Sequence, residues 1–219
     1  MKKVHLLIVI PLLLSISIAA TFYVTDGEVG PNGAYTFRVS ERKDGAVEVK
    51  IHLLPLLGSI ALQNYESANV ARVRALLARD SEPVEVQVTL RHPLGADEAR
   101  MFVDSVGLKV TSFLLVGKGS NGEKATTIIN SDLSEVPDSE TGPRDQSIKY
   151  LGVMVLQGTI APTAKDLGQL AADDRVYLAD TTLNEVRSLV RRDPRWSSKV
   201  IESVSAPSPF WDLAWGQQP

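Results

Sequence analysis

The sequence predicts a mixed α+β fold behind an N-terminal hydrophobic export segment. Stretches that alternate apolar and polar residues, as half-buried strands do, are interspersed with stretches whose apolar residues recur with helical spacing. The chain begins with an apolar segment, residues 4–20, that contains no charged residue. The expected organisation is a signal peptide or membrane anchor (1–24), a spacer with a β-hairpin (25–62), an α+β domain (63–204) and a Pro/Trp-rich C-terminal arm (205–219).

The composition bounds the class of protein. With 219 residues, 44% of them hydrophobic, the chain is long enough for one domain with a full core, or one domain and a small appendage. A formal net charge of −3 provides no broad attraction to nucleic acid, so we expect no nucleic-acid partner. The absence of cysteine excludes disulfides, thiolate nucleophiles and iron–sulfur clusters, and we expect no cofactor.

The N-terminal segment has the pattern of a secretory signal. Lys2 and Lys3 form a short positive region, an uncharged apolar run follows, and Ser17 and Ala19 place small residues around a cut after Ala19. Residues 4–24 are also long enough to span a bilayer, so an uncleaved anchor stays open as the alternative. In both cases we expect an extracytoplasmic protein, secreted or anchored, which contacts the membrane only through residues 4–24 and only if they stay uncleaved.

The first elements after the spacer form a predicted β-hairpin. Apolar and polar residues alternate over residues 46–53, a second strand covers 35–40, and a turn containing Asp44 and Gly45 joins them. Residues 64–80 have helical spacing, with apolar side chains gathered on one face.

The rest of the domain alternates strands and helices. Gly107 ends one helix and Pro162 precedes another, the places that these residue types favour. The expected strands are 84–90, 109–116, 124–130, 148–160 and 175–180, and the expected helices are 97–106, 163–172 and 183–192.

Residues 84–180 are thus predicted to run β-α-β, β, β-α-β. Two βαβ units of similar length joined by an antiparallel step are typical of a ferredoxin-like split βαβ sandwich, which is the expected fold of the domain. The N-terminal hairpin and the flanking helices are expected to extend the sheet or cover an edge.

Two short motifs resemble sites but lack the context that their chemistry needs. Residues 117–122 match G-x-G-x-x-G, yet strand-like residues follow where a nucleotide site needs a helix, and Asn121-Gly122 favours a hairpin turn. Ser40 and Lys43 have the S-x-x-K spacing, but they lie in the predicted hairpin and the companion motifs are absent.

His92 is the best-placed candidate for a catalytic base. It lies at the end of a predicted strand, and Asp97 and Glu98 follow it closely in the sequence. These three residues are the candidates for an exported hydrolase. The nucleophile motif G-x-S-x-G and the zinc motif H-E-x-x-H are both absent from the sequence.

The polar loop 131–147 is acidic. Its carboxylates at Asp132, Glu135, Asp138 and Glu140 are the kind of oxygen ligand that calcium prefers, so a calcium-sensing or small-molecule-sensing loop is an alternative function. The sequence has no EF-hand pattern, and acidic loops are usually simply solvated.

The C-terminal arm is the most unusual feature. All three tryptophans of the chain lie at or after position 196, and Phe210, Trp211, Leu213 and Trp215 follow a proline-rich stretch that favours an extended chain. Large aromatic side chains anchor interfaces, which makes these four residues candidates for partner binding. A tail also becomes ordered by docking onto its own domain, and both alternatives stay open.

The hypothesis from sequence is an exported, non-enzymatic protein of the cell envelope that acts as a protein-interaction or sensor module. Its expected partner is another envelope protein. The export pattern, the aromatic arm and the lack of a complete catalytic motif favour it. The hydrolase near His92 and the sensing loop are the alternatives.

Overall fold

The chain folds into two β-sheets and four α-helices, as a computed structural model of residues 27–30, 33, 35–53, 58–78, 82–136 and 148–207 shows. The predicted mixed α+β class is therefore confirmed. The export segment at residues 1–24 lies outside the described residues. Within the part of the chain that is described, no helix is long and apolar enough to cross a membrane.

The smaller sheet has four strands in the order β1-β2-β3-β9. Its strands are β1 (Glu28–Val29), β2 (Tyr35–Glu41), β3 (Val47–Leu53) and β9 (Ile201–Ser205). The predicted hairpin is confirmed, because β2 and β3 pair antiparallel around a turn in which Gly45 adopts a φ of 84°. The strand β9 was not expected, and it runs parallel to β3, so the two ends of the described chain meet in one sheet.

The larger sheet has five strands in the order β6-β5-β7-β4-β8. Its strands are β4 (Val84–Leu94), β5 (Lys109–Gly119), β6 (Lys124–Ile129), β7 (Ile148–Ile160) and β8 (Val176–Asp180). Every neighbouring pair is antiparallel. All five strands lie where the sequence predicts strands, with ends that differ by a few residues.

The helices also follow the prediction, with two local differences. They are α2 (Gly58–Leu77), α3 (Ala96–Val106), α4 (Gln169–Ala172) and α5 (Thr182–Arg192). Gly107 ends α3 with a φ of 68°, as expected. The helix α2 begins at Gly58 rather than Asn64, and the expected helix 163–172 opens with a π-helical turn (Ala164–Gly168) that the Thr163 hydroxyl caps.

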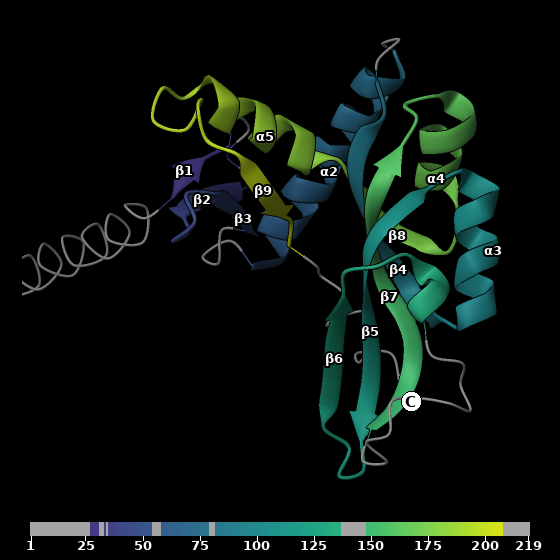
Figure 1. Cartoon of the computed structure of the whole chain (residues 1–219). Coiled ribbons are helices and arrows are strands. Elements are labelled where there is room, and N and C mark those ends of the chain that lie inside the picture. Colours follow the sequence, from purple (N-terminus) through teal and green to yellow (C-terminus); the bar gives the residue numbers. More distant parts are fainter. Residues whose placement is uncertain are drawn as a thin grey trace, which may run out of the picture.

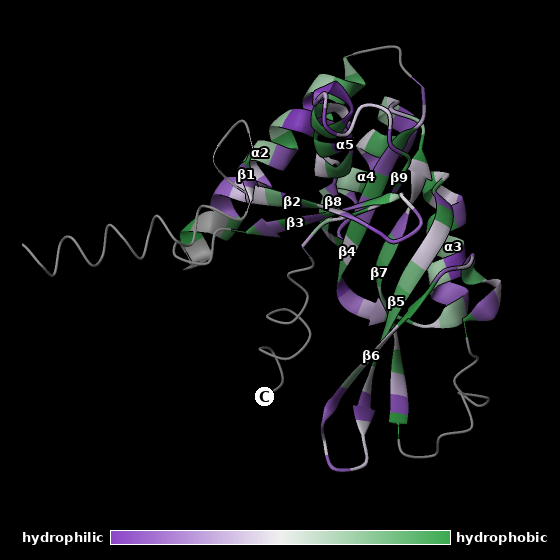
Figure 2. Cartoon of the chain, turned by 60° about the vertical axis from the view of Figure 1, so that its left-hand side comes forward, coloured by the Kyte–Doolittle hydropathy of each residue, from purple (hydrophilic) through white to green (hydrophobic). Residues whose placement is uncertain are grey.

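The large sheet separates two hydrophobic clusters. Figure 1 shows α3 and α4 on one side of it, and the small sheet with α5 on the other. The first cluster joins the large sheet to α3 and α4, and the second joins the small sheet to α5 and to Tyr65 of α2. The hairpin β5–β6 extends beyond the helices, and its tip is hydrophilic (Figure 2).

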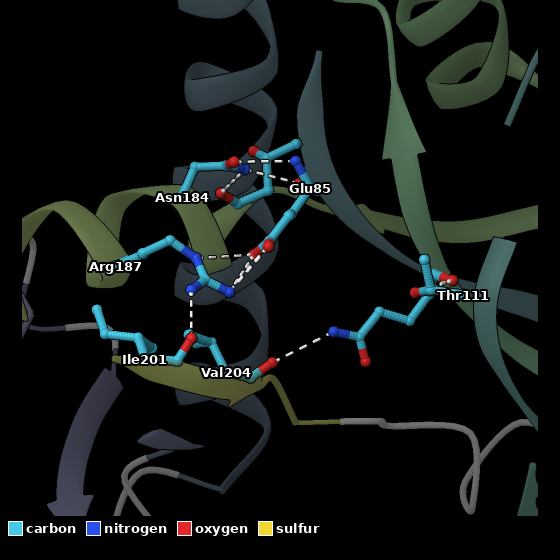
Figure 3. Close-up of polar contacts among 8 residues, drawn as sticks. Glu85, Thr111, Asn184, Arg187, Ile201 and Val204 are labelled. Atoms are coloured by element: carbon cyan, nitrogen blue, oxygen red, sulfur yellow. Dashed lines mark hydrogen bonds and ion pairs between the residues drawn. The ribbon is translucent and has the colours of Figure 1, made fainter. Parts of the chain in front are cut away.

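Polar contacts fix α5 and β9 to the edge of β4. Arg187 donates to the two carboxylate oxygens of Glu85 through Nη2 at 2.8 Å and Nε at 3.2 Å, and its Nη1 donates to the Ile201 carbonyl at 3.2 Å. Asn184 accepts a hydrogen bond from the Glu85 amide at 2.9 Å (Figure 3). A bidentate Arg–carboxylate pair constrains geometry as well as supplying energy, so the two sheets are held in one arrangement at this point.

Candidate functional site

The candidate catalytic residues are close in the sequence, but hydrogen bonds do not connect them into one site. They are His92, Asp97 and Glu98. All three side chains are exposed, His92 near the end of β4 and the two acids in the first turn of α3. The Asp97 carboxylate pairs with Arg100 at 3.0 Å, while no hydrogen bond among the described residues links His92 to either acid. The structure thus shows a histidine without an orienting partner, and the hydrolase alternative stays a prediction.

The acidic loop is described only at its start. Asp132 accepts a hydrogen bond from the Ser134 amide at 2.9 Å and so caps the short 3₁₀ turn Leu133–Glu135. Hydrogen bonding from Ser134 lowers the pKa of the Asp132 carboxyl. Asp138 and Glu140 lie outside the described residues. Among the residues that are described, no three His, Asp or Glu side chains gather as a metal site would require, and calcium binding stays a prediction.

Each of the two short motifs runs from the end of a strand into the hairpin turn that follows it. In the β5–β6 turn, Gly122 has a φ of 82° and its amide donates to the Gly119 carbonyl at 2.9 Å. Lys43 lies in the tight turn between β2 and β3, and Ser40 is in β2.

The aromatic residues of the C-terminal arm, Phe210, Trp211, Leu213 and Trp215, lie outside the described residues. The remaining tryptophan, Trp196, is half-buried and packs on the cluster between the small sheet and α5. Next to it, Arg195 pairs with Glu28 of β1 at 2.5 Å. Trp196 therefore belongs to the fold of the small sheet.

A buried polar network that the sequence did not predict lies at the junction of the two sheets. Its centre is Asp180, the last residue of β8, whose side chain is fully buried. The Tyr65 hydroxyl donates to Asp180 at 2.5 Å, and the Thr182 amide donates to it at 2.9 Å. Asn69, one turn after Tyr65 on α2, donates to the Ala179 carbonyl at 2.5 Å.

Arg72 continues this network one turn further along α2. Its Nε donates to Glu185 of α5 at 2.6 Å, and its Nη1 to the Thr182 hydroxyl at 3.1 Å. The guanidinium also lies 5.4 Å from the ring centroid of Tyr35, whose hydroxyl donates to Glu185 at 3.0 Å. Residues spaced by four and three positions share one face of a helix, which is why α2 presents all its polar members to the same junction.

Burial dominates the electrostatics of the network. It raises the pKa of the Asp180 carboxyl, while hydrogen bonds from Tyr65 and Thr182 oppose the shift. Burial also raises the pKa of both Tyr65 and Tyr35. Most of these polar groups are hydrogen-bonded within the protein, although the buried Nη2 of Arg72 has no hydrogen-bond partner among the described residues. The network therefore holds α2, β8, α5 and β2 together. Polar residues at helical spacing within residues 64–80 were the signal that would have revealed it.

A row of side chains crosses the five-stranded sheet on the face away from α3 and α4. Register pairs Ile128 of β6 with Leu114, Leu114 with Val155, Val155 with Thr89, and Thr89 with Leu178 of β8. Leu178 and Val155 are 5% and 6% exposed and Thr89 is fully buried, whereas Ile128 is 68% exposed. The outer end of this row is the solvent-exposed edge of the sheet.

The edge strand β6 has the features of a surface that pairs with another chain. Among the described residues, β5 is the only strand that pairs with it. Residues 126–128 are exposed, and over 125–129 the strand holds neither proline nor charge, the residues with which proteins usually protect a sheet edge.

The comparisons with known proteins identify no relative: no protein family, no curated protein and no solved structure matches the chain.

Proposed function

We propose that this chain is an exported, non-enzymatic protein of the cell envelope that binds another envelope protein, and that the edge of β6 is the binding surface. An extended segment of the partner adds a strand to the large sheet beside β6. The residues before the domain act as its signal peptide or, uncleaved, as its anchor in the membrane. The observation that carries the proposal is the exposed, uncharged edge at residues 125–129.

The hydrogen-bond pattern of the hairpin identifies the backbone groups that a partner strand would use. The Gly119 amide donates to the Glu123 carbonyl at 2.7 Å, which makes this a hydrogen-bonded pair. Hydrogen-bonded and non-bonded pairs alternate along an antiparallel ladder, and the register from Lys118–Lys124 to Phe113–Ile129 has no shift. The amides and carbonyls of Thr126 and Ile128 therefore point away from β5, toward the free edge.

The side chains of β6 also suit strand addition. Thr126, Thr127, Ile128 and Ile129 are β-branched, a residue class that favours extended backbone. Main-chain hydrogen bonds would supply affinity, and contact with the exposed Ile128 would favour a partner segment with an apolar residue opposite it.

We propose further that residues 84–180 form the ferredoxin-like split βαβ sandwich expected from the sequence. The strand order β5-β7-β4-β8, with antiparallel neighbours and helices after β4 and β7, supports this assignment. In this arrangement β6 is an addition at the edge of the sheet, which is consistent with a role in binding rather than in the core.

Affinity capture from envelope extract with a proline variant tests the function. Thr126→Pro removes an outward amide without removing a hydrogen bond to β5, so the chain should fold and lose its partner. Thr126→Ala is the matched control, because it changes the same side chain but keeps the amide, and it should retain the partner.

Equal capture by the two variants, with unchanged circular dichroism and melting, would show that β6 does not pair with the partner. If the only protein captured is a second copy of this chain, the edge of β6 mediates self-association, and the proposed envelope partner is refuted.

A further inference from the structure

We propose that the C-terminal segment 208–219 folds back onto the chain's own five-stranded sheet and seats its aromatic side chains on an inner apolar patch. The inner patch consists of Leu114, Val116, Leu151, Met154 and Val155, on β5 and β7. The inference is independent of the partner surface, because the patch lies inward from β6 and leaves its free edge open.

The path of the chain leads onto the face that carries the patch. Gln157 of β7 and Gln87 of β4 are direct cross-strand partners. The side-chain amide of Gln157 donates to the Val204 carbonyl at 3.3 Å, and the side-chain amide of Gln87 donates to the Pro207 carbonyl at 3.1 Å. Figure 3 shows the carbonyl oxygen of Val204 in its hydrogen bond to the large sheet. The last described residue, Pro207, is therefore held over the centre of this face.

The burial of the patch calls for a covering segment. Val116 and Met154 are fully buried, and Thr89, in the same cross-strand row as Val155, is fully buried with a hydroxyl that has no hydrogen-bond partner. Side chains of strands stand roughly perpendicular to the sheet, so their full burial requires atoms packed over that face. The hydrophobic residues grouped in this cluster are its own five members, and the cross-strand row continues from Val155 to Thr89.

The segment after Pro207 has the right length to supply that cover. Three extended residues from Pro207 to Phe210 span about 10 Å. Thr89 lies about 7 Å from Gln87 along β4, and the adjacent strand is about 5 Å away. Phe210 and Trp211 can thus reach the area above Thr89 and Val155.

The segment also has the right chemistry. Residues 210–215 contain Phe210, Trp211, Leu213 and Trp215 and a single charge at Asp212, which matches an apolar surface. Pro207 and Pro209 favour an extended approach. The loop 137–147, by contrast, is polar throughout and does not match the patch.

Thiol accessibility tests this inference directly, since the natural chain has no cysteine. The full-length chain carrying Val155→Cys would be compared with the same variant ended after Pro207. The control is Met101→Cys, at a position of α3 that is 72% exposed. We expect the cysteine at position 155 to react about 100-fold more slowly than the control in the full chain, and at a similar rate to it in the shortened chain.

Adding a peptide of residues 208–219 should restore the protection. Rapid reaction at position 155 in the full chain, or undiminished protection in a folded shortened chain, would overturn the inference. If the shortened chain does not fold, the full-length double variant Val155→Cys with Trp211→Cys decides: a disulfide forms on oxidation if the segment lies on the patch, and its absence refutes the placement.

Discussion

Removing the Tyr65 hydroxyl is the sharpest test of the buried network. In Tyr65→Phe the aromatic ring remains and keeps its edge-to-face contact with Tyr35, at 6.0 Å between ring centroids. Asp180, which is fully buried, loses the donor at 2.5 Å and has no solvent to replace it. A buried acceptor deprived of a partner costs about 2–3 kcal/mol of unfolding free energy.

Tyr35→Phe is the matched control. Tyr35 is also fully buried, but its hydroxyl donates to Glu185, whose side chain is 26% exposed and keeps its pair with Arg72 at 2.6 Å. Water and Arg72 remain available to the Glu185 carboxylate, so we expect a cost of about 1 kcal/mol.

Urea unfolding at neutral pH, followed by circular dichroism, measures both costs with one method. The Tyr65 variant should also melt about 4–12 °C lower than the wild type, given the size of the chain. Equal losses, or a larger loss for Tyr35→Phe, would refute the view that Asp180 is the centre of the network.

Two further predictions concern pH and close packing. Burial raises the Asp180 pKa above the 3.8 of an exposed carboxyl, so as pH rises from about 3.8 the folded chain retains a proton that the unfolded chain loses. The wild type should therefore lose stability relative to Asp180→Asn over this range, and urea midpoints measured from pH 3.5 to 7 that keep a constant difference would contradict this. Gly158→Ala should destabilise by at least about 3 kcal/mol, because an added Cβ would lie 2.2 Å from the Lys109 carbonyl oxygen. Gly168→Ala, in helical backbone with no contact shorter than 3.6 Å, should instead stabilise by about 0.5 kcal/mol. A higher melting temperature for Gly158→Ala than for Gly168→Ala would contradict the close packing of β5 against β7 at Gly158.

Local patterns were sufficient to predict most of the elements. The strongly apolar run that defines β7 (Ile148–Ile160), and the glycine that ends α3 (Ala96–Val106), are properties of short stretches of sequence. Asn121-Gly122 predicted the β5–β6 turn for the same reason, since a φ above zero favours glycine.

Features that depend on distant residues could not be predicted. The strand β9 pairs with β3 across some 150 residues of sequence, and its own five residues alternate only weakly. Asp180 is recognised as a buried group only when α2 is placed against β8. The exposure of β6 likewise depends on the strand order, because a β-branched strand of this composition is equally compatible with the centre of a sheet.

Site-specific photo-crosslinking in the native envelope tests the binding role of β6 most directly. A photoreactive amino acid would replace Ile128 on the exposed edge strand, and Met101, 72% exposed on α3, would carry it as the control. The account predicts a crosslinked envelope protein at position 128 and none at 101. Crosslinks of equal yield at both positions, or none at 128, would contradict it.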